Sequence, residues 1–372
     1  MAESISFART EEQAMLGATV REFLEATVDM DSTRDSSLTD SAINRDAWSG
    51  LVEMGLIGLH IPEEYGGAGY SFVETAIVFE ELGRRVVPVP LLSSTLASSA
   101  ILSAGSEDQK ARLLPQIASG ERIATLAAFE DAHDLERCET KAEPDGNGWR
   151  LSGLKRYVTD APNADAFVVI ADTGAGTGLF MVDGSAAGVS VNPTPSLDAT
   201  RPLGELELQN VAVDTGAYLG GSPSEHALRA ALDAGVVALA QEQAAGTQRC
   251  LEISVEYAKS RFQFGRAIGS FQAVKHMCAD MLVAVEHARS AASHAARTLD
   301  DPHESGVAVP LAKSVCSDAY LKAAGDTIQI FGGIGFTWEH DAHLYLKRAK
   351  STALLLGSVE SYRDRLADAI GI

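Results

Sequence analysis

The sequence has few cysteines, no excess of positive charge and no long apolar run. Its formal net charge of −21 argues against binding to nucleic acid or to an anionic membrane surface. Arg229 and Asp233 interrupt the longest alanine-rich segment, so no transmembrane helix is expected. The cysteines show no C-x-x-C spacing, which predicts neither a zinc site nor a disulfide framework. They are Cys138, Cys250, Cys278 and Cys316.

The first residues also lack the features of a secretion signal. Residues 1–12 contain neither a basic n-region nor an apolar h-region, so no signal peptide is expected. A length of 372 residues with 46% apolar content is enough for two or three domains, or for one large unit. We therefore expect a cytoplasmic protein that has no nucleic-acid or membrane partner.

The apolar pattern changes twice along the chain. Residues 1–120 show helical spacing, as in Trp48, Leu51 and Leu56. Residues 121–222 contain short runs of Val, Phe and Ile between Gly, Pro, Asn and Asp clusters, which predicts the strands of a small β domain. Residues 223–372 are helical again and rich in alanine, which is typical of a helix bundle.

Two long predicted helices meet at a turn around residues 257–272. Phe264-Gly265 interrupts the helical pattern, and the turn carries Arg261, Arg266 and Gln272. Arginine offers a planar fork of donors that fits phosphate oxygens, so this turn is a candidate diphosphate site. A solvated, salt-bridged helix end would account for the same residues.

A glycine-rich turn follows a later helical run. Its candidate residues, which would bring backbone N–H groups close to an anion, are Gln329, Phe331, Gly332, Gly333 and Gly335. The turn is not a Rossmann fingerprint, because no strand precedes it and the third glycine is absent. A helix C-cap is the simpler explanation of such a turn taken alone.

Taken together, these motifs resemble the acyl-CoA dehydrogenase family. Further similarities cover nearly the whole chain in the family's order; they lie at Ile61–Gly69, Glu80–Gly83, Gln109–Pro115 and Leu151–Lys155. The resemblance implies an α+β multidomain fold with a helical N-terminal domain, a central β-barrel and a C-terminal four-helix bundle.

The resemblance also implies a cofactor, a substrate and partners. In this family FAD lies between the β domain and the bundle of one subunit, and the adjacent subunit holds its diphosphate and adenine. An acyl-CoA is desaturated between its α and β carbons, and an electron-transfer flavoprotein is the expected electron acceptor. The residues that match the reaching subunit's positions are Arg261, Phe264, Gln272, Gln329, Gly332, Gly333 and Gly335.

The family's catalytic glutamate is missing from both of its usual positions. Leu356 occupies one of them and Gly235 the other, and neither side chain accepts a proton. Asp233, Glu242 and Glu360 lie nearby in the sequence, but the gapless register directs them to other faces.

The loop that should meet the flavin in the same chain is altered. Where the family has Thr-Glu-Pro-Gly-Ala-Gly-Ser-Asp, residues 129–134 have no glycine, and Asp131 and Asp134 add negative charge that disfavours a diphosphate. The later Trp-Ile-Thr-Asn-Gly motif is replaced by residues 157–161, which keep Thr159 and have Tyr157 in place of the tryptophan.

The sequence is therefore most similar to the non-catalytic, beta-type subunit of heterotetrameric dehydrogenases of steroid side chains. Such a chain would pair with a homologous catalytic subunit in an α2β2 tetramer and share that subunit's FAD. One alternative is a homotetramer that binds its own FAD and uses a displaced acid such as Glu242 or Glu360. Another is a purely structural bundle that has no flavin contact.

Overall fold

The chain folds into two compact units, each assembled from separate stretches of sequence. The helical unit comprises residues 9–31, 72–87 and 236–372, and the sheet unit comprises residues 32–71 and 88–235. The computed structural model describes residues 9–36, 39, 42–131 and 138–372.

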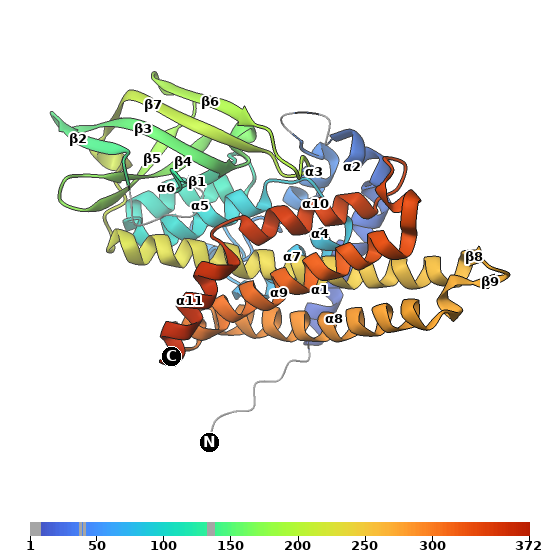
Figure 1. The fold of residues 1–372 in the computed structure, drawn as a ribbon. Coiled ribbons are helices and arrows are strands. Elements are labelled where there is room, and N and C mark those ends of the chain that lie inside the picture. Colours follow the sequence, from blue (N-terminus) through green and yellow to red (C-terminus); the bar gives the residue numbers. More distant parts are fainter. Residues whose placement is uncertain (1–8, 37–38, 40–41, 132–137) are drawn as a thin grey trace. The chain divides into compact units, whose positions relative to one another are not determined.

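The helical unit contains the long C-terminal helices together with two helices from the first part of the chain. Its elements are α1 (Glu11–Thr27), α4 (Phe72–Arg85), most of α7 (Ser224–Ser260), β8 (Phe262–Gln263), β9 (Arg266–Ala267), α8 (Gln272–Thr298), α9 (Pro302–Phe331), α10 (Ala342–Leu354) and α11 (Val359–Ile370). Figure 1 shows α8 and α9 side by side, with the β8–β9 hairpin at one end of this unit.

Small side chains explain why these helices pack closely. Ala288, Ala292 and Ala295 repeat at helical spacing along α8 and are buried. The Sγ of Cys316 on α9 lies 3.4 Å from the carbonyl oxygen of Ala288, a distance that only small facing residues permit. The predicted alanine-rich helical bundle is confirmed. No helix of the described residues is both long and apolar enough to cross a membrane.

The sheet unit combines short helices with one curled sheet. Its helices are α3 (Arg45–Glu53), α5 (Leu91–Ala104) and α6 (Glu107–Ala118), and α2 (Met30–Ser36) enters it from the helical unit. Its strands are β1 (Ala124–Ala127), β2 (Lys141–Asp145), β3 (Gly148–Thr159), β4 (Ala166–Asp172), β5 (Thr177–Asp183), β6 (Val189–Thr194) and β7 (Leu203–Asp214). Their order is β1-β4-β2-β3-β7-β6, and β5 pairs with β4.

The core of the sheet unit follows from its residue pattern. Gly204, Leu206 and Leu208 of β7 are buried and alternate with more exposed residues, as the period of two predicts. Trp149 and Phe180 close the core with ring centroids 5.4 Å apart. The predicted succession of helical, β and helical segments is confirmed, and short 3₁₀ turns complete the chain: η1 (Glu63–Tyr65), η2 (Ala161–Asn163), η3 (Thr215–Ala217), η4 (Ile268–Ser270) and η5 (Gly332–Phe336).

Candidate functional site

A tight hairpin forms the corner between α7 and α8. The turn of Phe264 and Gly265 connects β8 to β9, and both residues have positive φ, 53° and 78° respectively. This is the backbone of a two-residue type I′ turn. Phenylalanine rarely adopts the left-handed conformation, yet Phe264 does so while 90% exposed. The Phe264 ring meets the Phe271 ring edge-on, with centroids 6.1 Å apart, and otherwise faces solvent, as is common at interaction surfaces.

The polar candidates of the corner are also exposed. Arg261 directly follows α7, and its backbone is fixed by hydrogen bonds to Tyr257 and Ile268, both of 2.8 Å. Gln272 is the first residue of the 27-residue helix α8, whose exposed N-terminus favours anions. We call the exposed groups Arg261, Phe264 and Gln272, which the resemblance assigns to FAD binding, the flavin corner.

The glycine turn follows α9, and most of it is open. Gly332 ends the helix with φ 63° and ψ −141°, a conformation that favours glycine. A Cβ added at Gly332 or Gly333 would meet no atom within 4 Å, whereas at Gly335 it would lie 2.8 Å from the Cβ of Phe331. Gln329 is exposed. The backbone of the turn is therefore accessible at the first two glycines and packed at the third.

An aromatic stack joins the corner to the glycine turn. The rings of Tyr257 and Phe331 are stacked with centroids 4.2 Å apart. Tyr257 lies one helical turn before Arg261, and Phe331 precedes Gly332, so all the predicted flavin contacts gather at one end of the helical unit. Exposed Phe336 adds apolar surface there, as expected of an interaction site.

The two expected base positions are apolar and enclosed. Leu356 lies between α10 and α11 with φ 63°, is buried, and accepts a hydrogen bond of 3.2 Å from the hydroxyl of Tyr362 through its carbonyl oxygen. Gly235 is buried within α7. Neither position offers a group that removes a proton.

Of the displaced acids, Glu242 is engaged inside the bundle. Its carboxylate lies 2.6 Å from the guanidinium of Arg348, and both side chains are 2% exposed. Breaking such a buried pair is strongly unfavourable, so Glu242 serves the bundle's interior. Glu360 lies on the exposed face of α11.

A buried lysine holds the chain next to Leu356, a contact that the sequence pattern did not predict. The Nζ of Lys313 donates to the carbonyl oxygens of Thr352 and Leu355, both at 2.8 Å. These carbonyls end α10, where a cation is favourable. Burial lowers the pKa of Lys313 to about 7.

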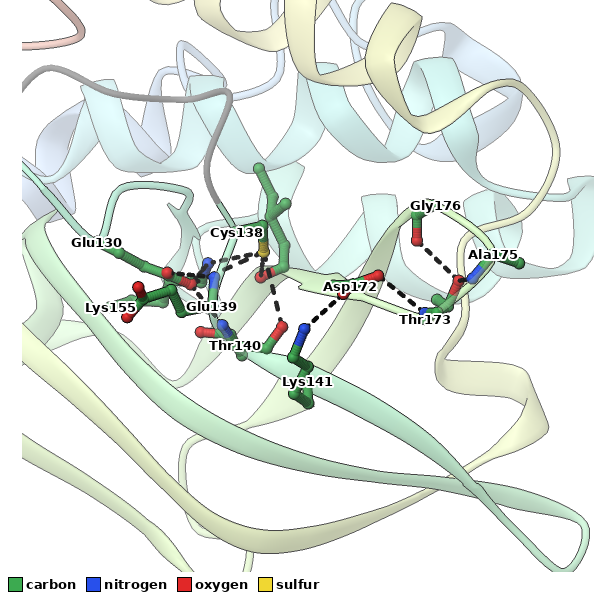
Figure 2. Close-up of polar contacts among 12 residues, drawn as sticks. Glu130, Cys138, Glu139, Thr140, Lys141, Lys155, Asp172, Thr173, Ala175 and Gly176 are labelled. Carbon is green, nitrogen blue, oxygen red and sulfur yellow. Dashed lines mark hydrogen bonds and ion pairs between the residues drawn. The ribbon is translucent and has the colours of Figure 1, made fainter.

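In the sheet unit, the described part of the altered loop contains an ion pair of Glu130 with Lys155 (Figure 2). The carboxylate of Glu130 lies 2.6 Å from the Nζ of fully buried Lys155 and accepts backbone N–H bonds from Glu139 and Thr140. Burial alone would raise the pKa of Glu130, but the bonds from Lys155 and Thr140 lower it to about 2. Cys138 lies beside this pair, 3.6 Å from the Nζ of Lys155.

A cavity of about 500 Å³ adjoins this ion pair, and acidic groups dominate its lining. Among the described residues of the lining, Glu130, Asp131 and Glu139 contribute carboxylates and Arg156 contributes a guanidinium. This charge balance disfavours a diphosphate. Ala132, His133 and Asp134 lie outside the described residues.

The second altered motif, residues 157–161, has an exposed aromatic ring at Tyr157 and a buried residue at Thr159. Tyr157 has φ 53° and is 40% exposed. Thr159 is buried, and its carbonyl oxygen accepts a hydrogen bond of 2.7 Å from the hydroxyl of Thr125. Thr159 therefore supports the sheet, and Tyr157 faces solvent.

Comparison with known proteins identifies the family. Sequence models of the acyl-CoA dehydrogenase N-terminal, middle and C-terminal domains match residues 10–121, 130–211 and 226–371. The chain belongs to the acyl-CoA dehydrogenase family, which confirms the resemblance and the fold class.

Its similar proteins include a steroid ACAD. Acyl-CoA dehydrogenase IpdE2 of Mycobacterium tuberculosis is 35% identical over 97% of this chain and 98% of its own length. The ChsE4–ChsE5 complex of Mycobacterium tuberculosis contains a similar fold, with a TM-score of 0.91 and 29% identity over 99% of both chains. A variant of the Tcur3481–Tcur3483 steroid ACAD gives a TM-score of 0.88 and 33% identity over 97% of this chain and 98% of the other.

Proposed function

We propose that this chain is the non-catalytic subunit of a heteromeric, FAD-dependent acyl-CoA dehydrogenase and that its flavin corner holds the FAD of a catalytic partner subunit. The observation that carries the proposal is the exposure of that corner. Strained Phe264, 90% exposed, and the neighbouring Arg261 and Gln272 face solvent. Within this chain the Phe264 ring has an edge contact with Phe271 and stays 90% exposed, whereas contact with a second chain would bury it.

The residues present fit the half of a flavin site that the adjacent subunit supplies, which we call the trans half. Arg261 supplies guanidinium donors for a diphosphate, and the α8 N-terminus with Gln272 and the open backbone of Gly332 and Gly333 supply uncharged ones. Bound FAD would accept the hydride from the β carbon of the acyl-CoA. In this proposal, the present chain only positions that cofactor.

The half that would perform chemistry does not fit. Apolar Leu356 and Gly235 take the base positions, so the general base has to come from the partner. In the altered loop, Glu130 binds Lys155 and lines an acid-rich cavity. We infer that no flavin binds in this chain's own half-site.

Two such halves imply a definite assembly. We call the other half, which lies in the subunit that carries the flavin, the cis half. A pair of these chains would combine good trans halves only with poor cis halves. A mixed pair gives one complete flavin site, and closed symmetry would join two mixed pairs into an α2β2 tetramer. The complexes of two differently named proteins among the similar structures, ChsE4–ChsE5 and Tcur3481–Tcur3483, support a mixed pair.

For the substrate we propose a CoA ester of a steroid side chain, with an electron-transfer flavoprotein as electron acceptor. The steroid ACAD among the similar structures supports the substrate class. The assembled complex should turn over a steroid-CoA faster than octanoyl-CoA, and equal rates on both would contradict the assignment.

The two alternatives have less support. A homotetramer with a displaced base would need a free acid in an enclosed site, but Glu242 is bound to Arg348 and Glu360 lies on the exposed face of α11. A purely structural bundle would leave strained, exposed Phe264 without a role.

Arg261→Ala tests the proposed role of the corner. Arg261 is exposed, so the variant should fold like the wild type. Loss of one charge-assisted contact should weaken FAD binding in the co-purified complex about tenfold or more. Lys259→Ala is a matched control, because Lys259 is an exposed cation in the last turn of α7 and pairs with Glu256. Unchanged flavin content in the Arg261→Ala complex would rule out this role.

A further inference from the structure

A second site lies in the helical unit, and none of its lining residues belongs to the flavin corner. It is a cavity of about 470 Å³ between α1, α4, α7 and α8. The space exists because small residues face it: Ala244 and Ala245 on α7, and Ser293 and Ala296 on α8. Ser293 and Ala296 are three positions apart, which places them on one face of α8. The volume is in the range of small-molecule sites.

Arginine dominates the walls of this cavity. Five guanidinium groups line it against the two carboxylates of Glu80 and Glu252. The arginines are Arg9, Arg21, Arg84, Arg289 and Arg297. Glu81 and Glu286 pair with Arg21 and Arg289 from outside the lining, so the five guanidinium groups face four carboxylates and keep a positive excess in a chain whose net charge is −21. This excess raises the local concentration of anions.

Ion pairs organise the arginines of α1 and α4 and leave donor capacity. The Nη2 of Arg84 lies 2.7 Å from the carboxylate of Glu252. Arg21 donates two hydrogen bonds of 2.8 and 2.7 Å to the carboxylate of Glu81, which is not part of the cavity lining. Each guanidinium has five N–H donors, so these bonds use fewer than half of them.

The α8 side of the cavity is less constrained. Arg289 pairs only loosely with Glu286, at 3.5 Å, and both side chains are 60% exposed. Such a pair contributes little, which allows Arg289 to turn to an incoming anion. Gln241 and Ser293 add uncharged donors.

We propose that this cavity binds a small phosphate-bearing anion, either an inorganic phosphate species or a phosphomonoester. Arginine forks bind phosphate oxygens in pairs, and a multiply charged phosphate offsets the excess of guanidinium groups better than a single carboxylate. This site is independent of the proposed flavin role, because the bound anion contacts α1, α4, α7 and α8 of this chain alone.

Isothermal titration calorimetry of the full-length chain in phosphate-free buffer tests the proposal, with pyrophosphate and AMP as probes. Saturable binding is expected for at least one of them: pyrophosphate alone indicates an inorganic ligand, and AMP a phosphomonoester. Arg289→Gln should weaken binding about tenfold. Glu80→Gln should strengthen it, because a competing carboxylate is removed; a merely structural salt-bridge network would show no gain.

Two controls separate this cavity from other cationic surfaces. Arg363→Gln changes an exposed arginine that pairs with Asp318 on another face and should leave binding unchanged. Arg261→Ala should also leave it unchanged. The proposal is overturned if neither probe binds at millimolar concentration, if Arg289→Gln binds like the wild type, or if Arg261→Ala alone abolishes binding.

Discussion

Replacing Glu130 by glutamine tests whether its ion pair with Lys155 stabilises the fold. The folded-state pKa of Glu130 is about 2, against an ordinary value of 4.5. Each pKa unit corresponds to about 1.4 kcal/mol, so this difference corresponds to roughly 3 kcal/mol. The carboxylate is 12% exposed at the rim of a cavity, and solvent screening reduces the expected loss on Glu130→Gln to about 2 kcal/mol.

The sign of the pH dependence follows from the lowered pKa. A carboxyl group with a depressed folded-state pKa stabilises the fold above its unfolded pKa. The contribution of Glu130 is therefore complete above pH 4.5 and is lost as the pH falls toward 2. Wild type and Glu130→Gln should differ by about 2 kcal/mol at pH 7 and converge only below about pH 2.

Urea unfolding followed by circular dichroism measures this difference. Glu143→Gln is the matched control, because Glu143 is an exposed residue of the neighbouring strand β2, and its effect should stay within about 0.5 kcal/mol. Combining Glu130→Gln with Lys155→Met should recover part of the loss, since the buried ammonium is then also removed. An effect of Glu130→Gln that equals the control, or that is the same at about pH 3 and pH 7, would refute the reasoning.

Three further predictions concern the helical unit. Arg348→Met leaves the buried carboxylate of Glu242 without its 2.6 Å partner, so urea unfolding should show a loss of about 3–5 kcal/mol, and an effect below about 1 kcal/mol would contradict the pair's importance. Lys313 has a folded-state pKa of about 7 against 10.5, so the unfolded chain binds more protons between these values and stability should rise with pH. Lys313→Met should reduce that slope between about pH 7 and 9 by up to about 1.4 kcal/mol per pH unit; identical slopes would exclude a role for its titration. Phe264→Ser removes an exposed ring, so the melting temperature of the chain should not fall. The flavin content of the complex should fall, and retained flavin would argue against a contact between Phe264 and the partner's FAD.

The succession of segments could be predicted from the sequence because it depends on local patterns. The alternation in β7 and the break at Phe264-Gly265 each follow from neighbouring residues. The domain limits 1–120, 121–222 and 223–372 remain a prediction. Each compact unit is assembled from separate stretches of the chain, so the two units do not test these limits. Residues 72–87 pack with the C-terminal helices, and no local pattern reveals such a partner.

The polar interior could not be predicted for a related reason. Glu130 and Lys155 are 25 positions apart and Glu242 and Arg348 are 106 apart, so their pairing depends on the complete fold. A charged residue inside an apolar run, such as Lys313, was the one available signal. Even that signal gives no partner, because the acceptors of Lys313 are backbone carbonyls.

The flavin content of purified assemblies tests the central claim most directly. We expect the chain alone to purify colourless and inactive, because its own half-site is lined by carboxylates such as Glu130 and its base position is Leu356. Co-purified with its catalytic partner, it should form an α2β2 complex that contains two FAD per four chains, measured as flavin absorbance against total protein. Four FAD per tetramer would contradict an empty half-site in this chain, and flavin or activity in the chain alone would contradict the non-catalytic assignment.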